Sequence, residues 1–150
     1  METVSKKRIW TGRVMSGVAV LFLAMDGLMK VAGAVPLKEG DELLLGFHPS
    51  ALPMIGALLL ACTALYVAPR ISVLGAILLT GYLGGAVACH VRVGNPLFTH
   101  TLFPTYVAVL VWGGLLLRNP GFSLLLPARK REEAATRAPA AQAFVAHARQ

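Results

Sequence analysis

Six side chains that could take part in chemistry lie within or next to long apolar stretches of this sequence. They are Asp26, Lys30, Tyr82, His90, Arg92 and His100. A charged side chain at the centre of a bilayer costs about 2.5 to 3.5 kcal/mol even on a lenient scale, so each charge needs a compensating partner. Asp26 and Lys30 are four residues apart and share one face of a helix, where they can form an ion pair.

Two interpretations of this polar set are open. In the first, the charges lock the helices together: Asp26 pairs with Lys30 or, if the first and third apolar segments pack side by side, with Arg92. In the second, His90, Tyr82 and the charged groups hold the polar head of a quinone or another isoprenoid lipid, while apolar walls hold its tail. Histidine titrates near neutral pH, so His90 could exchange a proton with such a headgroup.

The sequence offers little for metal or covalent chemistry. His90 and His100 could ligate a metal or a haem, but no cluster of residues at metal-ligand spacing supports this. Cys62 and Cys89 form no CxxC pair, and their expected depths differ by roughly 10 Å at 1.5 Å per residue, too far for a disulfide. No nucleophile-and-base pattern occurs. We therefore expect no catalytic residues, no metal, no intrinsic cofactor, and a protein that is not an enzyme by itself.

The composition indicates a membrane protein. The 150 residues are 56% hydrophobic and 14% charged, whereas soluble domains are roughly 45 to 50% apolar and about 25% charged. A membrane-spanning helix needs about 20 apolar residues, which leaves room for about four spans, short loops and a tail. The net charge of +7 lies largely in short basic blocks beside apolar stretches. Such blocks are typical of membrane orientation and lipid contact, so nucleic acid is not an expected partner.

The sequence predicts an all-α fold, an antiparallel bundle of four transmembrane helices. The first apolar stretch is too long, and carries too many charges, for the core of a cleaved signal peptide. Breakers containing proline follow each of the other three. The expected spans are about 9–35, 51–68, 71–93, and 97 or 102 to 117. The expected organisation is a basic N-terminus over 1–8, a transmembrane domain over 9–126 and a flexible tail over 127–150.

The distribution of Lys and Arg predicts the orientation of these spans. Most of the cations near span ends fall on one side of the membrane, and only Lys30, Lys38 and Arg92 fall on the other. Because the positively charged side stays cytoplasmic, both termini are expected in the cytoplasm. The polar set of Asp26, Lys30 and His90 then lies toward the outer face.

The third apolar stretch carries small residues at helical spacing. Helices in lipid gain little from hydrophobic exclusion, so small residues that allow close backbone approach favour their contact. Gly81 and Gly85 form a GxxxG motif, and Gly84 belongs to a row of small residues spaced by four. The motif predicts tight packing, either inside one chain or between the subunits of a homodimer. Small residues also occur at Gly56, Gly75 and Gly113-Gly114.

Three segments together resemble the DoxX-like family of small bacterial membrane proteins. They are Asp26-Gly27-Leu28-Met29-Lys30, Pro69-Arg70 and the run from Gly81 to Arg92. The resemblance extends over about residues 8–127, although Cys89 stands where the family pattern has Thr. It implies a four-helix bundle in the bacterial cytoplasmic (inner) membrane.

The resemblance also bears on function, because relatives called DoxX are named as small subunits of quinol-linked oxidoreductases. It points to quinone as a ligand and to a membrane oxidoreductase partner that carries the redox centre. We therefore expect an accessory membrane protein associated with lipid or quinone, with a polar cluster toward the outer face. The alternative is a membrane subunit of a quinol-linked oxidoreductase.

Overall fold

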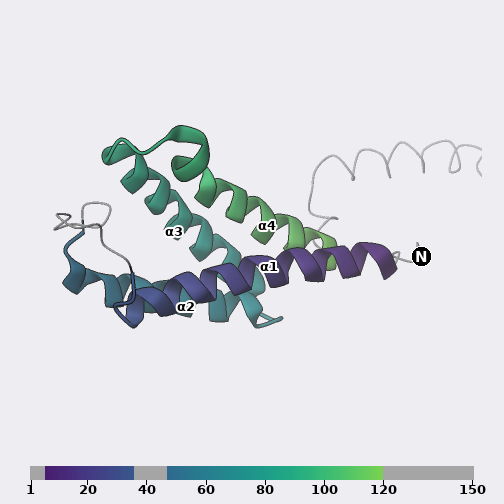
Figure 1. Ribbon diagram of the computed structural model, residues 1–150. Helices are drawn as coiled ribbons and strands as arrows, with labels where there is room; N and C mark the ends of the chain where they lie inside the picture. Colours follow the sequence, from purple (N-terminus) through teal and green to yellow (C-terminus); the bar gives the residue numbers. More distant parts are fainter. Residues whose placement is uncertain (1–5, 36–46, 120–150) are drawn as a thin grey trace, which may run out of the picture.

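The structure is a computed structural model that describes residues 6–35 and 47–119 as four long helices (Figure 1). The helices are α1 (Lys6–Val31), α2 (Leu52–Val67), α3 (Ser72–Arg92) and α4 (Phe103–Arg118). Two short turns, η1 (Pro49–Ala51) and η2 (Leu97–Thr101), precede α2 and α4. With these turns included, all four segments are long and apolar enough to cross a membrane. The predicted all-α bundle of four transmembrane helices is confirmed.

The helices end close to the breakers seen in the sequence. Ala68 is extended because the following residue is Pro69, which disfavours helix at the position before it. Gly94, at a φ of 69°, turns the chain away after α3. Leu97–Thr101 is a π-helical turn, so the regular part of the fourth span begins only at Phe103. The predicted tail over 127–150 and loop residues 36–46 lie outside the described residues.

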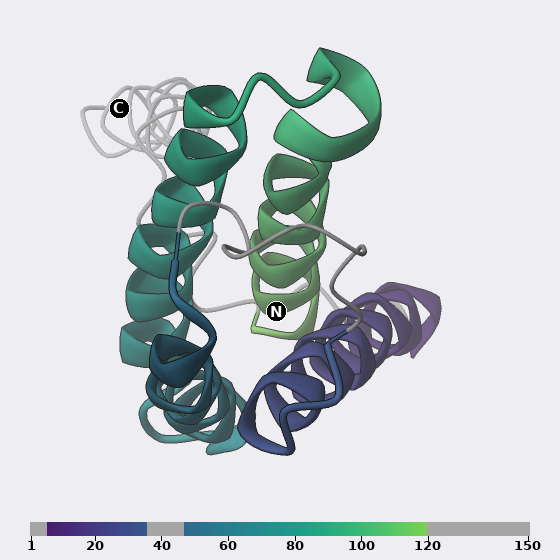
Figure 2. The ribbon, with the colours of Figure 1, turned by 60° about the vertical axis from the view of Figure 1, so that its left-hand side comes forward.

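The four helices occupy the corners of a bundle in which α1 and α3 are diagonal. Both α1 and α3 pack against α2 and α4 (Figure 2). Within the described part of the chain, no Cα atoms within 8 Å of each other join α1 to α3. The expectation that the first and third helices could lie side by side is therefore wrong. The α1–α2 and α3–α4 hairpins converge at one end and diverge toward the other (Figure 1).

The two ends of the bundle differ in their residues. The start of α1, the α2–α3 turn and the end of α4 meet at what we call the Arg118 end, where Gly12 lies against Leu117 and the backbone of Arg118. The end of α1, the start of α2 and the α3–α4 connection form the opposite end, which we call the His90 end. The polar residues singled out in the sequence lie toward the His90 end, except Tyr82, which is at the middle of α3.

Leucine and aromatic side chains fill the centre of the bundle. Leu59, Leu79, Leu115 and Tyr66 have no exposed surface. Many apolar side chains face outward as well, such as Leu21, which is 73% exposed. Helices that are apolar on both their inner and outer faces fit a lipid surrounding.

Glycines allow the closest contacts between neighbouring helices. A Cβ added at Gly75 would lie 2.2 Å from the backbone nitrogen of Tyr66, so α2 and α3 touch there through their backbones. At Gly56 an added Cβ would lie 2.7 Å from the carbonyl oxygen of Gly27, and at Gly114 it would lie 2.8 Å from the nitrogen of Ser16. These contacts join α2 to α1 and α4 to α1. The small positions noted in the second, third and fourth segments thus do pack closely.

The GxxxG motif of α3 does not pack within the chain. Gly81, Gly84 and Gly85 are exposed, and a Cβ added at any of them would meet no atom within 4 Å. The prediction that this motif packs α3 against another helix of the same chain is wrong. The opposite face of α3, which carries Leu79 and Leu83, is the one that is buried. Small residues permit close approach but do not by themselves decide which face makes it. The homodimer remains a prediction.

Candidate functional site

The ion pair expected in the first span is formed at the His90 end. Lys30 Nζ donates a hydrogen bond to Asp26 Oδ1 one helical turn away. The side chain of Lys30 is 16% exposed and that of Asp26 is 36% exposed, so the pair is partly shielded. The close contact at Gly56 brings α2 against this turn, next to the Cβ of Lys30. Asp26 is the one acidic side chain within the described ranges 6–35 and 47–119, and Lys30 neutralises it.

Arg92 occupies a different place from the one that an Asp26 pairing would need. It lies on the last turn of α3 and is exposed. Its pairing with Asp26 required α1 and α3 to be neighbours, whereas α2 and α4 separate them. Asp26 is therefore paired with Lys30 of its own helix.

The turn after α3 folds back on His90 and sets the hydrogen bonding of its ring. Asn95 Nδ2 donates to His90 Nδ1 at 2.8 Å, and the backbone nitrogen of Asn95 donates to the carbonyl oxygen of His90 at 3.1 Å. Because an amide nitrogen is only a donor, Nδ1 accepts, and the neutral ring carries its proton on Nε2. Thr101 Oγ1 in turn donates to the carbonyl oxygen of Asn95 at 3.1 Å. The imidazole is thus held in a defined orientation.

His100 approaches His90 from the connection between α3 and α4. The centroids of the two rings are 6.3 Å apart, and His100 Nδ1 is 2.8 Å from Thr99 Oγ1. The structure therefore brings the end of α3 and η2 together around His90, whereas in the described residues no Cα atoms within 8 Å of each other join α1 to either of them.

Tyr82 connects this group to the core. It lies about two turns before His90 on α3, is partly buried and packs against the core. The rings of Phe22 and Phe103 meet edge to face at 5.0 Å and join α1 to α4. We call Asp26, Lys30, Tyr82, His90 and His100 the His90 cluster. In it His90 lies beside His100, Asp26 pairs with Lys30 on α1, and Tyr82 packs against the core.

The His90 cluster carries hydrogen-bond donors and acceptors, and histidine is a side chain that can exchange a proton near neutral pH. In the described ranges, no three His, Cys, Asp or Glu side chains gather closely enough to hold a metal ion. Asn95 was taken in the sequence only as part of a helix breaker. An amide directly after a glycine at a helix end was the signal that could have identified it, since such residues fold back on the preceding turn.

A second polar group, which the sequence did not predict, lies near the Arg118 end. Tyr66 Oη donates to the carbonyl oxygen of Val111 at 2.8 Å and lies 2.9 Å from Ser16 Oγ. A phenol has a single hydrogen, so Ser16 is the donor to Tyr66. Arg118 Nη2 donates to the Tyr66 carbonyl oxygen at 3.2 Å, and its guanidinium lies 4.7 Å from the centre of the Tyr66 ring. These bonds join α1, α2 and α4.

The fold and the two polar groups define a polytopic α-helical membrane protein. The model of the DoxX-like family matches residues 14–114, more than half of the chain. The protein therefore belongs to the DoxX-like family, as its sequence segments predicted. No curated protein and no solved structure matches the chain.

Proposed function

We propose that this protein is an accessory membrane component that binds the head of a quinone, or of a similar isoprenoid lipid, at the His90 cluster. The observation that carries the proposal is the presence of two polar groups, His90 with His100 and Asp26 with Lys30, in the same half of a membrane-spanning bundle. Ionisable groups are kept inside a membrane chiefly where they serve a function.

The hydrogen bonding of His90 suits a ligand with carbonyl oxygens. With Nδ1 occupied by Asn95, Nε2–H is the group that donates to a ligand. Lys30 and Tyr82 supply further donors, and exposed apolar side chains toward this end, such as Leu28 and Val91, suit an isoprenoid tail. A bound quinone would supply the redox chemistry. The residues of the protein would bind the head, orient it and exchange a proton at His90.

The test is retention of quinone by the full chain purified in a mild detergent. Organic extraction followed by absorbance and mass spectrometry should find quinone in the wild type and much less in His90→Ala. His48→Ala is the matched control, because His48 is exposed, bonds only locally to Ser50 and lies outside the cluster. Wild-type protein without quinone, or equal loss from both variants, would show that the cluster does not hold this ligand.

The alternative is a membrane subunit of a quinol-linked oxidoreductase, with the redox centre in a partner protein. Family membership supports it only at the level of the family. Mild cross-linking in native membranes followed by affinity purification distinguishes the two. A stoichiometric redox protein in the purified material would favour the subunit, and quinone retained by the isolated chain would favour the accessory component.

We further propose that the protein resides in the bacterial cytoplasmic membrane with both termini in the cytoplasm. The Arg118 end carries Lys6, Lys7, Arg8, Arg13, Arg70 and Arg118, and positive charge stays on the cytoplasmic side. A reporter that works only in the cytoplasm should be active when it is fused at the C-terminus. A reporter that works only outside the cytoplasm should be active when it is inserted at Gly40. The opposite pattern would place the His90 cluster on the cytoplasmic side.

A further inference from the structure

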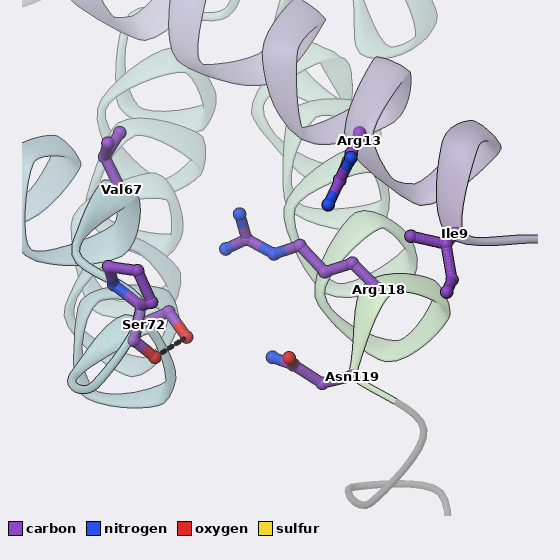
Figure 3. A pocket seen from close by; sticks show the side chains of 7 residues that line it. Ile9, Arg13, Val67, Ser72, Arg118 and Asn119 are labelled. Carbon is purple, nitrogen blue, oxygen red and sulfur yellow. Dashed lines mark hydrogen bonds between the residues drawn. The ribbon is translucent and has the colours of Figure 1, made fainter.

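A cavity of about 180 Å³ opens at the Arg118 end, far from the His90 cluster. Its lining comes from the start of α1, the α2–α3 turn and the end of α4. Ile9, Val67, Pro69 and Ser72 supply apolar and small surface. Arg13, Arg118 and Asn119 supply the charged and amide groups, and their side chains extend toward the same space (Figure 3).

The two arginines bring positive charge into this cavity without a matching acid in the described residues. Arg118 Nε is buried and has no hydrogen-bond partner there. Asp26, the one acid in the described ranges, pairs with Lys30 and lies 13 residues from Arg13, about 20 Å along α1. A partly buried cation is costly unless an opposite charge and hydrogen bonds compensate it. The cavity is thus suited to an anion.

The arrangement of donors favours a phosphate group. The Arg118 guanidinium is held from one side by the Tyr66 ring and carbonyl oxygen. Arginine has a planar fork of N–H donors that matches phosphate oxygens, and Arg13 and Asn119 add donors from other directions. The volume admits a phosphate group together with a few waters, each of which takes about 30 Å³ in the liquid.

We propose that the cavity lined by Arg13, Arg118 and Asn119 is a binding site for a phosphate group, carried by an anionic phospholipid headgroup or by a soluble phosphate. Apolar Ile9 and Val67, near the start of α1 and at the end of α2, line the cavity and are compatible with the acyl side of a lipid. The site is independent of the proposed quinone site, because it lies at the other end of the bundle and shares no residue with it.

The experiment is native mass spectrometry of the full chain in a neutral detergent, titrated with three probes. They are dioleoyl phosphatidylglycerol, dioleoyl phosphatidylcholine and sodium phosphate. A lipid site predicts that phosphatidylglycerol binds at least about tenfold more tightly than phosphatidylcholine, and that sodium phosphate competes only weakly. A site for soluble phosphate predicts that sodium phosphate binds with a stoichiometry of one and displaces the lipid.

Variants connect the binding to the cavity. Arg13 is exposed and forms no part of the Tyr66 hydrogen-bond group, so Arg13→Gln should fold and bind the preferred probe about tenfold more weakly. Arg70→Gln removes the same charge from the same end but lies outside the cavity lining, and should change affinity less than twofold. Asn119→Ala provides a second variant that does not disturb Arg118.

Three results would overturn the proposal. The first is the absence of specific binding for both phosphatidylglycerol and sodium phosphate. The second is equal weakening by Arg13→Gln and Arg70→Gln, which would mean that only the overall charge attracts the probe. The third is unchanged affinity in both Arg13→Gln and Asn119→Ala.

Discussion

Replacing Gly75 with alanine tests the packing of the bundle most directly. The added Cβ would lie 2.2 Å from the Tyr66 nitrogen and 2.4 Å from its Cα. Both atoms belong to the backbone of α2, so no side chain can rotate away, and α2 and α3 must separate by about 0.8 Å to reach a distance of 3.0 Å. Overpacking typically costs about 1 to 3 kcal/mol, and the upper value applies where the backbone must move.

Gly85→Ala is the matched control on the same helix. No atom lies within 4 Å of its added Cβ, so only helix propensity changes, which favours alanine by about 1 kcal/mol in water. At Gly75 the same gain of about 1 kcal/mol offsets part of the overpacking cost of about 3 kcal/mol, so Gly75→Ala should be about 2 kcal/mol less stable than wild type. We therefore expect the two variants to differ by about 3 kcal/mol.

The assay is reversible unfolding of the purified chain in mixed micelles with increasing sodium dodecyl sulfate, followed by circular dichroism. Gly85 lies on the face that a homodimer would use, so Gly85→Ala could also change the oligomeric state. Light scattering at the same protein concentration measures the oligomeric state and so distinguishes a loss of the homodimer from a loss of folding. If Gly75→Ala were as stable as Gly85→Ala, the backbone contact between α2 and α3 would not exist as described.

Two further predictions concern polar groups in the bundle. Tyr66→Phe removes the hydroxyl that bonds to Val111 and Ser16 and should destabilise the protein by about 1 to 2 kcal/mol, whereas Tyr106→Phe on an exposed side chain should be neutral. Asp26→Asn should cost about 1 to 2 kcal/mol, between the values for exposed and fully buried ion pairs, because it leaves the Lys30 amine uncompensated. Asp26→Leu combined with Lys30→Leu should recover most of this stability, and the same unfolding assay would contradict the pairing if it showed no recovery.

Features that depend on nearby residues were predictable from the sequence. The spans follow from the length of the apolar stretches, and their ends follow from residues such as Pro69 and Gly94 that change the backbone locally. The pairing of Asp26 with Lys30 needs only the spacing of one helical turn, which the sequence states directly.

The pairing of helix faces was decided by the tertiary structure. The GxxxG motif at Gly81 and Gly85 marked one face of α3 for close packing, yet the chain buries the face with Gly75 and Leu79. Both faces are apolar and both carry small residues, and lipid is as apolar as either. Hydrophobicity therefore cannot distinguish them, and the choice depends on the fit of whole helix surfaces.

The polar group around Tyr66 shows the same limit at longer range. Ser16, Val111 and Arg118 lie 45 to 52 residues from Tyr66 in the sequence, and each is ordinary in its own segment. Their hydrogen bonds, and the basic cavity beside them, form only because α1, α2 and α4 meet at one end of the bundle. From the sequence alone one can determine that this protein is a four-helix membrane protein with charged residues near both membrane faces. Tertiary packing decided which of those residues meet, since contacts between helices depend on three-dimensional fit and not on local spacing.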